Sequence, residues 1–141
     1  MRNIKLRAMM CLLLCLCLLP LAPIAVAEGG QKKVTVMVYM CGSNLESGNM
    51  AGTRTISEIL GSRFNTEEVN VIIMLGGSIS WAQGYPNDKL TILEIAGRRP
   101  RTVETLDGAS MGDGNTLLQF LNYCHDNYPA ESYDLVIWNH G

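Results

Sequence analysis

The chain has 141 residues, of which 48% are hydrophobic and 17% are charged, and its formal net charge is −2. This length suits one domain at the small end of the usual size. The slightly acidic balance provides no basic footprint, so we expect no nucleic-acid partner.

Residues 1–27 have the three parts of a secretory signal peptide. The first seven residues contain no acid and three bases: Arg2, Lys5 and Arg7. A long apolar stretch follows, and the small-x-small sequence "AVA" precedes Glu28. We therefore expect cleavage after Ala27 and secretion into the extracellular space.

Two alternatives to a cleaved signal are weaker. A retained membrane anchor is disfavoured because Pro20 and Pro23 shorten the apolar helix below the roughly 20 residues that a span needs. A lipid-modified cysteine would follow a small residue, whereas the cysteines of this segment follow methionine or leucine: Cys11, Cys15 and Cys17.

Cleavage would leave 114 residues, and loss of the three bases would change the net charge from −2 to −5. Only Cys41 and Cys124 would remain of the five cysteines. Two cysteines so far apart form no disulfide framework, so both a single pair and two buried free thiols stay open.

The first two predicted strands follow one plan. Residues 32–40 and 69–77 are nearly continuous apolar runs followed or closed by glycine, which is typical of strands covered on both faces. A helix is predicted between them, with an uncertain start after residue 43 and Gly61 as its stop. Its apolar side chains share one face: Ile56, Ile59 and Leu60.

A hairpin is predicted within residues 90–106, with its turn at 97–100. Three basic side chains crowd this turn, and we interpret them as a solvated tip rather than a ligand site: Arg98, Arg99 and Arg101.

The clearest predicted helix lies within residues 111–129. Asp113 can cap it and Pro129 ends it. Apolar positions recur at helical spacing: Leu117, Leu121, Cys124 and Tyr128. The sequence "DLVIWNHG", residues 134–141, then supplies a last apolar strand with His140 just beyond it.

This order of strands and helices predicts an α/β fold with right-handed crossovers and a mainly parallel sheet. Ligands of such sheets bind beyond the carboxyl ends of the strands, which is where His140 is expected. The second histidine, His125, is expected at the helix surface, and no spacing of ligand side chains predicts a metal site.

Two segments, "YMCGSNLES" (39–47) and "NYPAESYDLVIWNHG" (127–141), resemble the clostripain family of cysteine peptidases. The resemblance covers most of residues 28–141 and is weak between Ser78 and Thr105. It implies a caspase-like three-layer sandwich and a peptidase that uses a Cys–His dyad. It also implies an N-terminal piece that is truncated before the strand bearing the catalytic cysteine.

The resemblance assigns the dyad histidine to His140 and an oxyanion-binding backbone N–H to Gly141. An imidazole, with an unperturbed pKa of about 6.5, can assist a thiol and protonate a leaving amine near neutral pH. Fixed N–H groups stabilise the oxyanion. The implied partners are a protein or peptide with Arg or Lys before the scissile bond and the missing C-terminal part of the peptidase.

In the family, the nucleophile lies in an Asp-x-Cys pattern at the end of the strand that follows the histidine-bearing strand. This sequence contains neither that strand nor that pattern. Cys41 is at the same predicted edge as His140, but we interpret it as a packed thiol, and Cys124 as a core residue. Some relatives require calcium, for which Asp107 and Asp113 are candidate acids. The alternative function is a non-catalytic secreted α/β binding domain or a degenerate relative of the peptidases, and a surface-anchored protein is a third possibility.

Overall fold

The computed structural model describes residues 31–140. The predicted signal peptide at 1–27 and the predicted oxyanion donor Gly141 lie outside the described residues. No helix within 31–140 combines the length and the apolar character that crossing a membrane requires.

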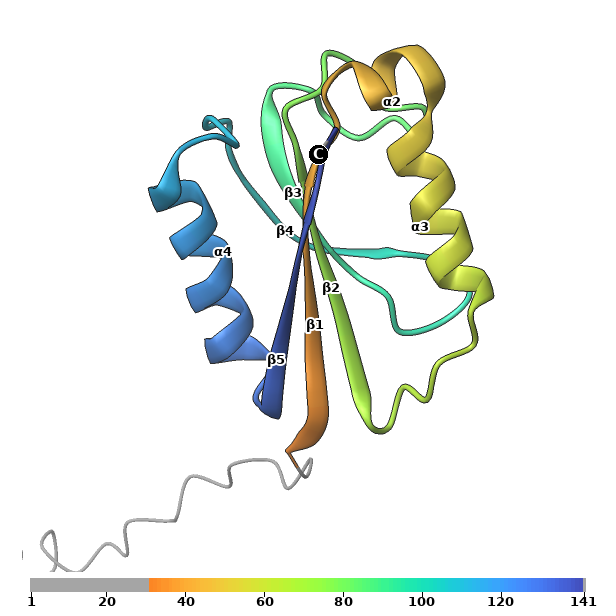
Figure 1. The fold of residues 1–141 in the computed structure, drawn as a ribbon, viewed down its shortest axis with the longest axis vertical. Coiled ribbons are helices and arrows are strands. Elements are labelled where there is room, and N and C mark those ends of the chain that lie inside the picture. The colour runs from red at the N-terminus through yellow and green to blue at the C-terminus, as the bar shows by residue number, and fades with distance from the viewer. Residues whose placement is uncertain (1–30, 141) are drawn as a thin grey trace, which may run out of the picture. The chain divides into compact units, whose positions relative to one another are not determined.

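The described part folds as one α/β unit. In chain order its elements are β1 (Lys32–Cys41), α2 (Ser43–Asn49), α3 (Ala51–Gly61), β2 (Val69–Gly76), β3 (Lys89–Glu94), β4 (Arg101–Asp107), α4 (Gly114–Asn127) and β5 (Ala130–Trp138). The five strands of residues 31–140 form one sheet in the order β4-β3-β2-β1-β5. Helix α4 lies against one face of this sheet and α3 against the other (Figure 1).

Strand β1 lies at the parallel centre of the sheet. Its Val38 pairs with Ile73 of β2 on one side and with Val136 of β5 on the other, in parallel register. Strand β3 runs antiparallel to β2, and β4 runs antiparallel to β3. The predicted α/β fold and hairpin are therefore confirmed, but the sheet is mixed rather than mainly parallel, because the hairpin adds two antiparallel pairings beside β2.

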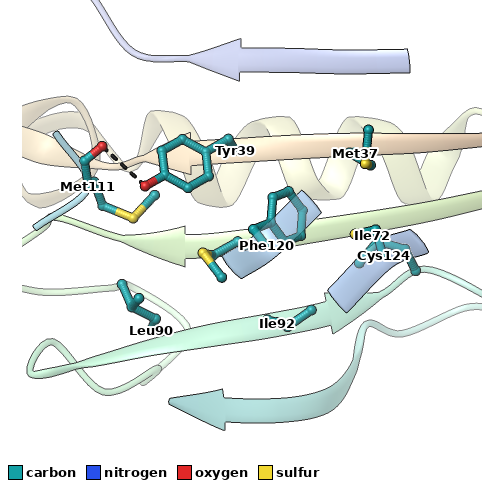
Figure 2. Close-up of a cluster of buried hydrophobic side chains, with 9 residues drawn as sticks. Met37, Tyr39, Ile72, Leu90, Ile92, Met111, Phe120 and Cys124 are labelled. Carbon is teal, nitrogen blue, oxygen red and sulfur yellow. Dashed lines mark hydrogen bonds between the residues drawn. The ribbon is translucent and has the colours of Figure 1, made fainter. Parts of the chain in front are cut away.

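Each face of the sheet has its own hydrophobic core. On the α4 face, Phe120 and Cys124 are fully buried against Met37 and Tyr39 of β1 (Figure 2). The Tyr39 hydroxyl donates a hydrogen bond to the Met111 carbonyl oxygen at 3.1 Å, so the phenol of this buried residue has a partner.

On the α3 face, Ile56 packs with Met40 of β1, Ile73 of β2 and Trp81 of the following loop. The indole leaves no room at the turn after β1, because a Cβ built on Gly42 would lie 2.8 Å from Trp81 Cζ2. Glycine is therefore required at this turn for steric reasons.

The predicted helices are confirmed with one difference. Asp113 caps α4 as expected and accepts a hydrogen bond from the Asn115 N–H at 2.9 Å. The predicted helix after β1 is divided into α2 and α3, because Met50 between them has the left-handed φ of 53°.

Strand β5 forms one edge of the described sheet, and its apolar side chains are exposed. Exposed fractions are 40% for Leu135, 44% for Val136 and 65% for Ile137. Successive side chains of a strand point to opposite faces, so both faces of this edge are apolar. An unpaired edge of this kind invites association with another chain.

We predict that isolated residues 28–141 self-associate through β5. Analytical ultracentrifugation should show concentration-dependent oligomers, and Ile137→Lys should reduce them, because an edge lysine opposes strand pairing. Gln119→Lys adds the same charge to the exposed face of α4 and is the matched control. A monomer with a sharp cooperative melt would contradict this prediction.

Candidate active site

The parallel strands bring three sequence-distant segments to one edge of the sheet. Strands β1, β2 and β5 run in the same direction, so the residues after their last positions share an edge. These segments begin at Gly42 after β1, Gly77 after β2 and Asn139 after β5. The structure therefore places His140 at the sheet edge where the sequence predicted it.

His140 is exposed to solvent and makes two hydrogen bonds. Its Nε2 atom lies 2.6 Å from Oδ1 of Asn44, in the first turn of α2. Its backbone N–H donates to Oδ1 of Asn139 at 2.8 Å. The ring is thus held by one side chain at Nε2, and its other nitrogen, Nδ1, makes no hydrogen bond within residues 31–140.

The start of α2 is tied to the end of β2. The Ser43 N–H donates to the Gly77 carbonyl oxygen at 3.0 Å, and the Ser78 hydroxyl donates to the Ser43 carbonyl oxygen at 2.9 Å. Ser43 itself has a φ of 45°, a left-handed conformation that serine rarely adopts. These bonds over-determine the strained residue and thereby fix the position of Asn44 beside it.

A buried carboxylate joins α2 to its surroundings. Glu46 is only 1% exposed, and its oxygens accept hydrogen bonds from the Thr53 N–H at 2.8 Å, the Thr53 hydroxyl at 2.7 Å and the Ala82 N–H at 3.0 Å. Burial raises the pKa of Glu46, but these donors and the Gly52 N–H outweigh burial, so the net pKa is lowered. The ionised carboxylate therefore holds together α2, α3 and the loop after β2.

Both described cysteines are free thiols in or beside the α4-face core. Cys41 packs against that core, and burial raises the pKa of its thiol. Cys124 is fully buried, and burial raises its pKa to about 12. The packed interpretation of Cys41 and the core interpretation of Cys124 agree with these positions, because a protonated, packed thiol is a poor nucleophile.

The candidate acids for calcium have other partners. Asp107 pairs with Lys89 at 2.9 Å, and Asp113 caps α4. Within residues 31–140, no three His, Cys, Asp or Glu side chains are grouped to hold a metal ion. Neither acid is therefore part of a cluster of ligand side chains within the described residues.

The remaining charged candidates lie at the surface. The His125 side chain is 76% exposed, as expected, and stacks on Tyr133 with ring centroids 5.8 Å apart. Arg98 and Arg99 are exposed near the hairpin turn, and Arg101 forms an ion pair with Glu94. None of these side chains belongs to the edge that carries His140.

Two residues of this edge were missed by the sequence analysis as site residues. The local pattern predicts only that a helix starts somewhere after residue 43, and it singles out neither Asn44 nor Glu46. Both lie in the segment "YMCGSNLES", so this motif was the available signal. The pairing of Asn44 with His140 joins residues that are 96 positions apart in sequence, and a local sequence pattern does not reveal such a contact.

Comparisons with known proteins agree with this architecture. The model of the Clostripain family matches residues 38–141. Clostripain from Hathewaya histolytica is 26% identical over an alignment of 129 residues that covers 78% of this chain and 24% of clostripain's length. The chain thus spans about a quarter of this curated relative.

Solved structures share the fold at low sequence identity. A B. fragilis cysteine protease aligns with a TM-score of 0.60 at 19% identity, over 77% of this chain and 89% of that chain. A clostripain from Bacteroides thetaiotaomicron, in complex with the peptide inhibitor BTN-VLTK-AOMK, gives 0.58 at 19% identity, over 79% and 92%. A secreted C11 cysteine protease from Bacteroides thetaiotaomicron gives 0.60 at 20% identity, over 77% and 29%.

We predict that Glu46→Gln destabilises the full-length protein by about 2 kcal/mol at neutral pH. The glutamine amide is uncharged and has one acceptor oxygen instead of two, so the charge-assisted hydrogen bonds to the carboxylate are lost. Because the pKa of Glu46 is lower in the folded state, the carboxylate stabilises the protein fully at pH values above its ordinary pKa of 4.5. This stabilisation is lost as the pH falls through the lower pKa of the folded state. Urea unfolding at several pH values measures it. Glu58→Gln, on the exposed side of α3, is the matched control. A difference between wild type and Glu46→Gln that does not shrink in acid would contradict the prediction.

Proposed function

Since the chain belongs to the clostripain family, we propose that it forms the histidine-bearing part of a secreted cysteine endopeptidase. His140 is the dyad histidine of this proposal. The observation that carries it is the placement of an exposed imidazole at the carboxyl edge of the parallel strands, held at Nε2 by Asn44.

In the proposed reaction, His140 takes the proton of a thiol and the resulting thiolate attacks the peptide carbonyl carbon. The C–N bond breaks as His140 returns the proton to the leaving amine, and an acyl-enzyme remains. A water molecule, deprotonated by the same imidazole, then releases the acid and restores the thiol. The N–H of Gly141 is the proposed donor to the oxyanion.

We propose that the thiol comes from outside residues 31–140, on a strand that pairs with β5. The exposed apolar side chains on both faces of β5 support this placement, because a neighbouring strand and its connections would cover them. Neither Cys41 nor Cys124 makes a hydrogen bond to His140 within the described residues, and both lie at the α4-face core.

The proposed substrates are proteins or peptides with Arg or Lys before the scissile bond. The family match supports a protein substrate. The inhibitor bound by the Bacteroides thetaiotaomicron clostripain carries the peptide letters VLTK, with lysine last, which agrees with a basic preference.

We predict that His140→Ala lowers kcat of the full-length protein by about 10²- to 10⁴-fold on peptide amides ending in Arg or Lys, because proton transfer is lost. Cys41→Ala is the matched control and should keep its activity, since that thiol packs against the core. Cleavage that is unchanged in His140→Ala would remove His140 from the mechanism. Binding of such peptides without cleavage by the wild type would favour the non-catalytic binding domain.

Secretion is the second part of the proposal. Two of the structural relatives are described as secreted C11 cysteine proteases, and residues 1–27 have the pattern of a signal peptide. We predict that the secreted protein begins at Glu28, as measured by mass spectrometry of its N-terminal peptide. A mature protein that still begins at Met1 would support an anchored form instead.

A further inference from the structure

The contact between His140 and Asn44 joins the carboxyl ends of two adjacent strands. Asn44 follows β1 and His140 follows β5, and these strands pair directly. The two side chains lie 96 residues apart in sequence, and the 2.6 Å distance from Nε2 to Oδ1 is that of a short hydrogen bond.

The backbone around both partners is fixed. Asn139 Oδ1 accepts from the His140 N–H at 2.8 Å and lies 3.4 Å from the donating Ser43 hydroxyl. Ser43, in its left-handed conformation, is bound in turn to the end of β2 through Gly77. The backbone segments that carry Asn44 and His140 are therefore held in place by hydrogen bonds, and these bonds position the two side chains next to each other.

The amide oxygen of Asn44 determines which atom of this contact donates the hydrogen bond and which accepts it. A carbonyl oxygen only accepts hydrogen bonds, so a nitrogen that bonds to Oδ1 of Asn44 carries a hydrogen. A neutral imidazole has one N–H, and its other nitrogen then bears the lone pair.

We propose that Asn44 is a positioning residue that holds neutral His140 as the Nε2–H tautomer and leaves Nδ1 to take the proton of the catalytic thiol. This inference rests on the proposed function and deepens it by naming the reacting nitrogen. It also requires that the incoming thiol approach Nδ1 rather than Nε2.

The arrangement serves both halves of the reaction. Nε2 carries a hydrogen in the neutral ring and also in the imidazolium, so the bond to Asn44 is kept in both states. The ring therefore keeps its orientation as it changes from base to acid. Loss of orientation costs rate, since a displacement of about 1 Å is worth about 10²-fold.

The test compares Asn44→Ala with Asn44→Asp in the full-length protein. Asn44→Ala removes the acceptor, whereas Asn44→Asp keeps an oxygen at the same place. Asn49→Ala, at the other end of the same helix and also exposed, is the matched control. The readouts are kcat and KM on a peptide amide ending in Arg or Lys. Two-bond nitrogen–proton NMR patterns of ¹⁵N-histidine protein at about pH 9, where imidazole is neutral, report the tautomer.

We expect wild type, Asn44→Asp and Asn49→Ala to show His140 as the Nε2–H tautomer, and Asn44→Ala to show a mixture with Nδ1–H. Asn44→Ala should lower kcat about 10²-fold with little change in KM, and Asn44→Asp should lower it less. A wild-type Nδ1–H tautomer, or wild-type kcat in Asn44→Ala, would overturn the inference. If His140→Ala is inactive while Asn44→Ala is not, only this inference fails. If His140→Ala is active, the proposed function fails as well.

Discussion

The parallel pairing of β5 with β1 determines where the chemistry of this chain is located. The two strands are in register from Lys32 opposite Ala130 to Met40 opposite Trp138. His140 follows two residues after Trp138, and Asn44 follows four residues after Met40. A slip of one residue would move the histidine by about 3.3 Å and turn every β5 side chain to the other face. The hydrogen bond between the two residues therefore depends on this register.

The two hydrophobic cores hold the register of β5 against β1, and the site lies next to them at the carboxyl ends of the parallel strands. Tyr39 and Phe120 fix β1 from the α4 face, while Ile56 fixes it from the α3 face. Polar interactions then position α2, with Glu46 as the buried carboxylate that joins α2 to α3 and to the loop after β2. Strand β5, which leads to the proposed site, is apolar on both faces and exposed within the described residues. In the proposed enzyme, one neighbouring strand would cover β5 and bring the thiol to His140.

Most of the fold was predictable because the signals are local. Continuous apolar runs identified β1, β2 and β5, and Asp113 and Pro129 marked the limits of α4. The break between α2 and α3 was not predicted, since methionine carries no signal for the left-handed conformation that Met50 adopts where its N–H caps the end of α2.

The site was predictable only in part. The position of His140 at the carboxyl edge follows from strand order, and its role was inferred from family resemblance. Its bond to Asn44 requires the register of two strands that are distant in sequence. The burial of Glu46 likewise requires the loop that carries Ala82, so an acid that looks like a surface helix residue in sequence is a structural anchor.

The central claim is that the His140 imidazole acts on a thiol carried by a strand beside β5. A crystal structure of the full-length protein, bound to a covalent peptide inhibitor with lysine at its reactive end, tests this most directly. The account predicts a cysteine sulfur bonded to the inhibitor, within hydrogen-bond reach of His140 Nδ1, on a strand that pairs with β5. An inhibitor bonded to any residue distant from His140, or a β5 edge with no strand beside it, would contradict the account.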